Sequence, residues 1–225
     1  MRFDCEALLF DLDGVLVDSA ECVERTWHRW AEAHGLDPAA VILAAHGRRT
    51  IETVQAVAPH LAADAEVARL AASESNETNG VYEIAGAREL LRTLPDRSWA
   101  VVTSGIRAVA ELRIRHTRLS DPPVLVCADD IRSGKPDPEG FLAAAQRLGV
   151  EPGRCLVIED APPGIEAARA AGMRVIGIIG TYGREALAGA DGLVPSVAWM
   201  DVQVSGQELH VVLREPRDLA HRRLT

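Results

Sequence analysis

Short runs of consecutive apolar residues recur along the chain, and stretches with helical spacing separate most of them. The apolar runs occupy residues 7–10, 99–102, 124–127, 155–158 and 175–179. A strand that is buried on both faces needs apolar residues at every position, so these runs predict the strands of a parallel sheet. The helical stretches occupy residues 86–94, 107–112, 138–148 and 164–171. The alternation predicts a doubly wound α/β fold.

Residues 18–85 interrupt this alternation, because they contain no strand-like run. Their amphipathic helical stretches occupy residues 20–34, 39–45, 49–58 and 64–77. An all-helical block placed after the first strand predicts a smaller domain inserted into the α/β core. We therefore expect a discontinuous core of residues 1–17 and 86–225, with a helical insert of residues 18–85. Near the end of the core, residues 201–213 alternate around Ser205-Gly206 and predict a β-hairpin.

The composition is that of an ordinary globular protein, with 48% hydrophobic and 25% charged residues. Its net charge of −9 argues against nucleic acid and anionic membrane surfaces as partners, since both attract basic proteins. No apolar run reaches membrane-spanning length, and no apolar segment followed by a small-residue cleavage site comes after Arg2 and Asp4, so we expect neither a membrane span nor a signal peptide. The four cysteines are scattered, which favours buried reduced thiols over a zinc site. We expect a cytoplasmic protein and a monomer.

Polar residues that can bind ligands or take part in catalysis follow the predicted strands. In an open α/β sheet the carboxyl ends of the strands share one edge, which is where ligands bind. Lys135 lies in a loop beyond the third strand and is the only lysine among 24 lysine and arginine residues, which indicates a place where a compact ammonium group is needed. The groups at this edge are Asp11-Leu12-Asp13-Gly14, Thr103-Ser104-Gly105, Lys135 and Glu159-Asp160.

These residue types together suit phosphoryl transfer. A carboxylate such as Asp11 can attack phosphorus and form an acyl phosphate, which divides hydrolysis into two easier steps. Asp11 and Asp160 offer the oxygen ligands that Mg²⁺ prefers. Asp13 is placed to protonate the leaving oxygen and then to deprotonate the attacking water. Thr103, Lys135 and backbone N–H groups can hold the other phosphoryl oxygens.

Each of these segments also has a purely local interpretation. Asp-x-Asp-Gly can form a turn, and Thr103-Ser104-Gly105 can connect a strand to a helix. Glu159-Asp160 can cap the helix that follows. Their coincidence at four strand ends of one chain favours the functional interpretation.

Taken together, the four segments resemble the motifs of the haloacid dehalogenase-like hydrolase superfamily, in order and over roughly residues 5 to 180. They are Leu9 to Ser19, Val101 to Gly105, Gly134 to Pro138 and Val157 to Ile165. The resemblance implies a Rossmann-like doubly wound parallel sheet core with an inserted all-helical cap domain. The cap domain that the resemblance implies directly follows the first motif. This is the position at which the hydrophobic pattern predicts the helical insert.

The resemblance also implies site roles. Asp11 would be the nucleophile, Asp13 the general acid/base, and Thr103 and Lys135 the groups that hold phosphate. The implied ligands of Mg²⁺ are Asp11, Asp160, Asp13 through its backbone carbonyl, and Glu159 in an assisting role. Dehalogenating members lack the second aspartate, and phosphonate-cleaving members use a cap lysine, which residues 18–85 do not contain. Phosphate-ester hydrolysis and phosphosugar mutation remain.

Within the superfamily, the cap segment around His46, Arg48 and Arg49 looks most like that of sugar and polyol phosphatases. We expect these three side chains, with Ser104 and Gly105, to contact substrate, the alternative being a solvated loop. The leading hypothesis is a Mg²⁺-dependent phosphatase that hydrolyses small sugar or polyol phosphate monoesters through a phospho-Asp11 intermediate. The alternatives are a phosphosugar mutase of the β-phosphoglucomutase type and a non-catalytic sugar-phosphate-binding module. A cap hinge is expected near residues 15–19 and 82–87.

Overall fold

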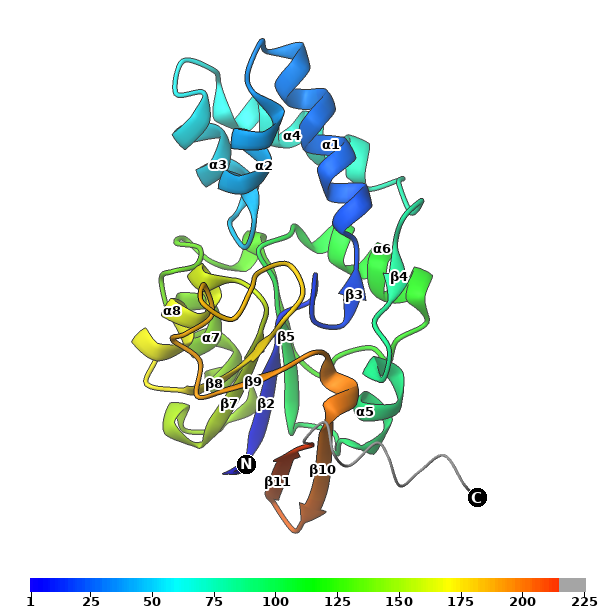
Figure 1. Ribbon diagram of the computed structural model, residues 1–225, viewed down its shortest axis with the longest axis vertical. Coiled ribbons are helices and arrows are strands. Elements are labelled where there is room, and N and C mark those ends of the chain that lie inside the picture. Colours follow the sequence, from blue (N-terminus) through cyan, green and yellow to red (C-terminus); the bar gives the residue numbers. More distant parts are fainter. Residues whose placement is uncertain (215–225) are drawn as a thin grey trace.

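The computed structural model describes residues 1–214. Figure 1 shows a twisted sheet with helices on its two faces and a bundle of helices above one end of the strands. Residues 215–225, which the sequence analysis assigns to the core, lie outside the described residues.

The central sheet has six strands in the order β6-β5-β2-β7-β8-β9, and every neighbouring pair is parallel. Counted along the chain, this is the 3-2-1-4-5-6 order of doubly wound folds, so the predicted fold class is confirmed. The first of these strands, β2, lies between β5 and β7, where the strand order reverses and such folds bind ligands. The strands are β2 (Ala7–Phe10), β5 (Trp99–Val102), β6 (Leu125–Val126), β7 (Cys155–Glu159), β8 (Arg174–Ile178) and β9 (Gly192–Val194).

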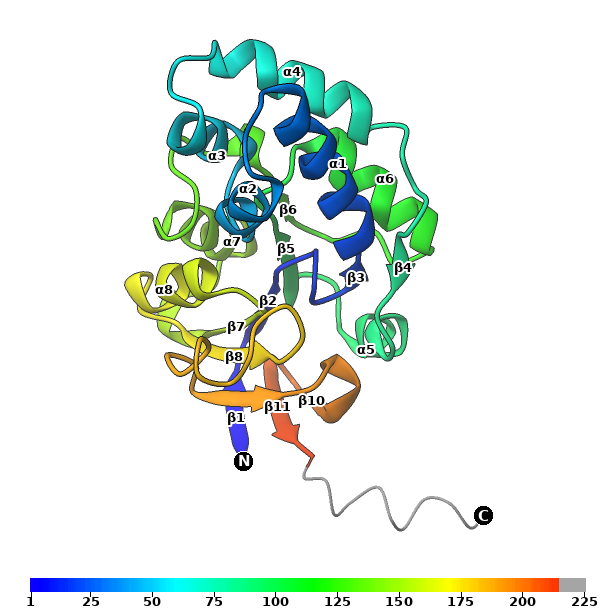
Figure 2. The ribbon, with the colours of Figure 1, turned by 45° about the horizontal axis from the view of Figure 1, so that its top comes forward.

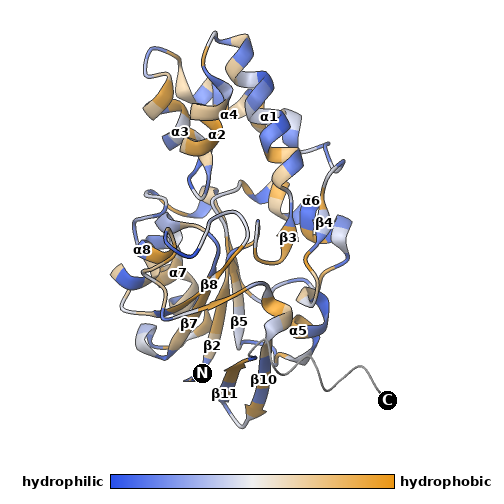
Figure 3. Ribbon diagram, viewed as in Figure 1, coloured by the Kyte–Doolittle hydropathy of each residue, from blue (hydrophilic) through white to orange (hydrophobic). Residues whose placement is uncertain are grey.

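Alternate residues of the strands pack into two layers of helices. Leu8 and Phe10 of β2 belong to one apolar cluster, with residues of α5 (Ala87–Thr93) and α6 (Arg107–Thr117). Ala7 and Leu9 belong to a second cluster, with residues of α7 (Glu139–Leu148) and α8 (Pro162–Ala170). The helix pairs lie on opposite sides of the sheet in Figure 2, and the central strands are mostly hydrophobic in Figure 3. Burial on both faces explains the uninterrupted apolar runs.

The helical insert has its own apolar cluster, built around Trp27, Trp30 and Val54. Its helices, which we call the cap, are α1 (Ala20–Ala33), α2 (Pro38–Ala45), α3 (Thr50–Val57) and α4 (Ala63–Glu74). The chain enters the cap through β3 (Val17–Asp18) and returns through β4 (Tyr82–Glu83), and these two strands pair antiparallel. The sequence analysis did not predict this ribbon, which joins the two segments where the hinge is expected.

The predicted C-terminal hairpin is confirmed as β10 (Met200–Ser205) and β11 (Glu208–Leu213). The hairpin and β1 (Arg2–Cys5) form a three-stranded sheet, in which β11 pairs with β1. The sequence analysis missed β1. This sheet lies at the end of the molecule opposite the cap (Figure 1). The remaining short 3₁₀ helices are η1 (Ala128–Asp130), η2 (Pro152–Arg154) and η3 (Val197–Trp199). Within residues 1–214, no helix has the length and apolar character needed to cross a membrane.

Candidate active site

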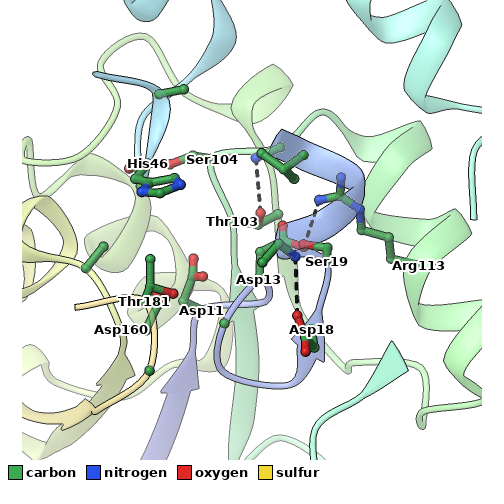
Figure 4. Close-up of a pocket in the computed structure, with 18 of the residues that line it drawn as sticks. Asp11, Asp13, Asp18, Ser19, His46, Thr103, Ser104, Arg113, Asp160 and Thr181 are labelled. Carbon is green, nitrogen blue, oxygen red and sulfur yellow. Dashed lines mark hydrogen bonds and ion pairs between the residues drawn. The ribbon is translucent and has the colours of Figure 1, made fainter. Parts of the chain in front are cut away.

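The strand ends bring the predicted site residues to one edge of the sheet. Asp11 follows β2, Thr103 follows β5, and Asp160 follows β7, and all three are buried. Lys135 comes from the loop between η1 and α7 and is also buried. Asp11, Thr103 and Asp160 line a cavity of about 620 Å³ between this edge and the cap. Figure 4 shows the carboxylates on one side of this cavity and His46 of the cap on the other.

The ammonium group of Lys135 joins two of the carboxylates. Its Nζ contacts Asp11 Oδ1, lies 2.8 Å from Glu159 Oε2, and donates to the carbonyl oxygen of Val102 at 3.3 Å. Burial alone would lower the pKa of Lys135, but the negative charges of Asp11 and Glu159 outweigh burial and raise this pKa above its ordinary value. Lys135 is therefore a fixed positive charge beside the candidate nucleophile.

Three buried carboxylates meet around this single cation. Oxygens of Asp11, Glu159 and Asp160 lie within 4.8 Å of one another. Burial raises the pKa of Asp11, and it raises the pKa of Asp160 to about 7, with the neighbouring Glu159 charge acting in the same direction. One lysine cannot balance three carboxylates, and a set of buried carboxylate oxygens is the donor chemistry that a hard divalent cation such as Mg²⁺ prefers.

Gly14 makes room for this cluster. A Cβ at this position would lie 2.1 Å from Asp160 Oδ2, and the backbone has a φ of +84°, which favours glycine. The glycine of the Asp-x-Asp-Gly segment therefore allows a close approach between the loops that follow β2 and β7, as well as a turn.

The raised pKa of Asp160 predicts a pH dependence for the stability of the metal-free protein. Because the folded-state pKa of about 7 exceeds the reference value of 3.8, the folded state binds more protons between these two pH values. The stability contributed by this group therefore falls as the pH rises through this interval and stays low above it. With a chelator present, we expect the urea midpoint of unfolding of Asp160→Asn to exceed that of the parent at about pH 8. The difference between the two midpoints should close towards about pH 4. A gap that widens at low pH would contradict this assignment.

The side chain of Asp13 is held by two donors. Its Oδ1 accepts a hydrogen bond from Ser19 Oγ at 2.6 Å and lies 2.7 Å from Nη1 of Arg113 (Figure 4). Asp13, Ser19 and Arg113 all line the cavity. The structure thus places Asp13 in the same cavity as Asp11, with its carboxylate oriented by neighbours.

The second predicted segment contacts both the site and the cap. Thr103 Oγ1 accepts a hydrogen bond from the backbone N–H of Gly105 at 3.0 Å. Ser104 Oγ donates to the carbonyl oxygen of Gly47 in the cap at 3.0 Å. All three residues from Thr103 to Gly105 line the cavity, and their contacts to phosphate and substrate stay a prediction.

The three predicted cap residues separate into two groups. His46 and Arg48 line the cavity, and burial lowers the pKa of His46, which keeps its ring neutral near pH 7. Arg49 is not part of the cavity lining. Its guanidinium donates to the carbonyl oxygens of Ile131 and Arg132, at 3.1 and 2.6 Å, and pairs with Glu52. The structure therefore places Arg49 at a contact between the cap and the core.

Other residues that line the cavity were not identified from the sequence. Val23, Glu24 and Trp27 follow Ala20 along α1 at helical spacing, a stripe that periodicity could have shown to share one face. Thr181 donates a hydrogen bond to Asp160 Oδ2, and no local motif marks it. Glu74 and Arg113 also belong to this group, and both are largely buried.

Comparison with known proteins identifies the family. A family model described as haloacid dehalogenase-like hydrolase matches residues 5–172. The chain belongs to the haloacid dehalogenase-like hydrolases. The resemblance inferred from the four motifs is thereby confirmed, and the six-stranded sheet with its helical insert is the fold of this hydrolase.

Similar proteins in this family include named phosphatases. Hexitol phosphatase A of Escherichia coli is 43% identical over 77% of this chain and 83% of its own length. The 2-deoxyglucose-6-phosphate phosphatase 2 of Saccharomyces cerevisiae is 32% identical over 95% of this chain and 96% of its own length. Among solved structures, a hydrolase from Pseudomonas syringae has a TM-score of 0.74 at 29% identity, over 85% of this chain and 94% of that chain.

Proposed function

We propose that this haloacid dehalogenase-like hydrolase is a Mg²⁺-dependent phosphoric monoester hydrolase that acts on small sugar or polyol phosphates through a phospho-Asp11 intermediate. The observation that carries the proposal is the position of Asp11, buried at the switch point of the sheet, in contact with Lys135 and open to the cavity. The names of the similar phosphatases support hexitol and sugar phosphates as the substrate class.

In the first step, a carboxylate oxygen of Asp11 attacks phosphorus as the bond to the ester oxygen breaks. Asp13 gives a proton to that oxygen, and the alcohol leaves. In the second step, Asp13 takes a proton from a water that attacks the acyl phosphate, which releases inorganic phosphate and regenerates Asp11. Thr103 and Lys135 hold the phosphoryl oxygens that take no part in bond exchange.

The buried oxygens of Asp11, Glu159 and Asp160 support a divalent-cation site at this cluster. We propose that Mg²⁺ is held by Asp11 and Asp160, by the backbone carbonyl of Asp13, and with help from Glu159. When bound, it would offset the repulsion between the anionic substrate and the buried carboxylates. Lys135 supplies the fixed positive charge of the chain itself.

A phosphosugar mutase would form the same phospho-Asp11, so the product distinguishes the two activities. Water receives the phosphoryl group in a phosphatase, whereas a sugar hydroxyl receives it in a mutase. We therefore propose incubating the purified protein with Mg²⁺ and a panel of sugar and polyol phosphates, and measuring both free phosphate and isomerised sugar phosphate. Phosphate release is the expected result. Isomerisation without release would indicate the mutase, and no turnover by folded protein would favour a non-catalytic binding module.

The different positions of Arg48 and Arg49 allow a matched pair of variants. Arg48 is exposed at the cavity wall, so Arg48→Met is expected to raise KM by about tenfold with little change in kcat. Arg49→Met removes contacts to two core carbonyls and to Glu52, so we expect it to lower the midpoint of thermal unfolding instead. A larger KM effect for Arg49 than for Arg48 would contradict these placements.

We propose that the cap domain spans residues 18–85 and the core residues 1–17 and 86–225, as the sequence predicts. The separate apolar cluster of the cap supports this division. Cys5, Cys22, Cys127 and Cys155 are all free and buried, which suits the reducing cytoplasm that we propose as the compartment. Size-exclusion chromatography tests the expected monomer.

A further inference from the structure

A buried arginine lies between the candidate acid/base and the cap. The side chain of Arg113, on α6, is only 5% exposed. Its Nη1 lies 2.7 Å from Asp13 Oδ1, and its Nη2 lies 3.9 Å from Oε1 of Glu74 at the end of α4. Figure 4 shows the guanidinium reaching from its helix towards Asp13 and Ser19.

The negative charges of Asp13 and Glu74 compensate for the burial of the positive charge of Arg113. Burial raises the pKa of Glu74; the positive charge of Arg113 acts in the opposite direction, and the negative charge of Asp13 adds to the rise. Burial would lower the pKa of Arg113, but the charges of Asp13 and Glu74 outweigh it. Two carboxylates from different parts of the fold therefore share one guanidinium.

A role in packing alone does not explain this residue. Taking a guanidinium out of water is unfavourable, and an apolar side chain of similar volume would fill the same space without that penalty. Arg113 also lines the cavity, together with Val109 one helical turn earlier. The side chain is thus directed at the cavity wall where Asp13 lies, rather than at the apolar cluster below.

We propose that Arg113 is a positioning residue that orients Asp13 for proton transfer. Arg113 and Ser19 anchor Oδ1 of Asp13, so that Oδ2 carries the proton given to the leaving oxygen and later accepts the proton of the attacking water. Arg113 itself transfers no proton and touches no substrate atom in this scheme. The inference rests on the proposed phosphatase activity and adds a residue outside the four sequence motifs.

The dependence on the leaving group tests this role. An alkyl phosphate such as glycerol phosphate must have its leaving oxygen protonated, whereas p-nitrophenyl phosphate releases a stable phenolate without a proton. The ratio kcat/KM includes only the steps up to release of the alcohol, so later hydrolysis of phospho-Asp11 does not affect it. We therefore compare kcat/KM for both esters in the parent and in Arg113→Met.

For Arg113→Met we expect a loss of about 100-fold with the alkyl ester and of less than about threefold with the aryl ester, since general acid catalysis contributes 10²–10⁴. Arg113→Lys, which keeps a cation, should recover part of the loss. In an Asp13→Asn background, Arg113→Met should have no further effect on the alkyl ester. Arg115→Met serves as the matched control, because Arg115 lies on the same helix with an exposed side chain and pairs with Glu111.

Equal losses with both esters would overturn the inference and indicate a purely structural arginine, as would an Arg113→Met variant that keeps full activity on the alkyl ester. Both results leave the proposed phosphatase activity standing. A folded parent protein that hydrolyses neither ester in the presence of Mg²⁺ would overturn the proposed function and, with it, this inference. Circular dichroism and urea unfolding of each variant identify those that fail to fold, for which Arg113→Lys provides the comparison.

Discussion

Replacing Asp11 with asparagine is expected to lower turnover by roughly 10⁴-fold or more, because removal of the covalent nucleophile of a serine protease costs on the order of 10⁶ in kcat. Asparagine has the shape of aspartate, but its amide cannot form an acyl phosphate with the substrate. The fold should survive, since the change removes one of three mutually repelling carboxylates. Phosphate release and circular dichroism check both expectations.

A trapped intermediate would make the test specific for Asp11. Acid quenching of the parent during turnover of a ³²P-labelled ester should leave label on the protein, and Asp11→Asn should carry none. Asp18→Asn is a suitable control, because Asp18 lines the same cavity but is exposed and lies outside the carboxylate cluster. Label retained by Asp11→Asn would mean that another side chain is the nucleophile.

The parts of the fold that sequence analysis predicted are those determined by local pattern. Strands buried on both faces leave uninterrupted apolar runs, so β2, β5 and β7 were placed within a residue of their observed ends. The site residues follow these strands directly, and parallel pairing brings them together. The common edge of Asp11, Thr103 and Asp160 could thus be predicted without knowledge of the side-chain contacts.

Three of the four missed strands, β1, β3 and β4, depend on partners far away in the sequence, whereas the fourth, β9, has only three residues and pairs with β8. The strand β1 is short and half exposed, and it exists because β11, some 200 residues later, pairs with it. The ribbon of β3 and β4 likewise joins segments on either side of the cap. None of the strands β1, β3 and β4 has enough apolar residues of its own to be distinguished from a loop.

The same limitation explains why Arg113 was missed and why Arg49 was expected beside Arg48. The sequence analysis ended α6 at Leu112, whereas the helix continues to Thr117 with Ile114 buried against the core. Arg113 was thereby left outside any element and its burial could not be anticipated. Arg49 was grouped with Arg48 by adjacency, although neighbouring residues on a chain often point in different directions.

Replacing Lys135 is expected to have the second large effect, on stability as well as on activity. Its ammonium is buried between Asp11 and Glu159. Removal of one partner from a buried ion pair typically costs about 3–5 kcal/mol, because the remaining charges lose their compensation. For Lys135→Met in the metal-free protein, we expect a loss of this size in the free energy of unfolding. We also expect a fall of about 10²–10³ in kcat, since a group that stabilises the phosphoryl oxygens is lost.

A double variant separates charge balance from packing in this loss. If uncompensated carboxylates cause the destabilisation, then Asp11→Asn in the Lys135→Met background should restore part of the unfolding free energy, because two buried carboxylates remain instead of three. If lost packing against Phe141, whose ring centroid lies 5.3 Å from Nζ, were the cause, the second change would restore nothing. Urea unfolding of the parent, the two single variants and the double variant gives the coupling free energy directly. Added Mg²⁺ should stabilise Lys135→Met more than the parent, since the variant has lost the chain's own cation at a cluster that suits a divalent ion.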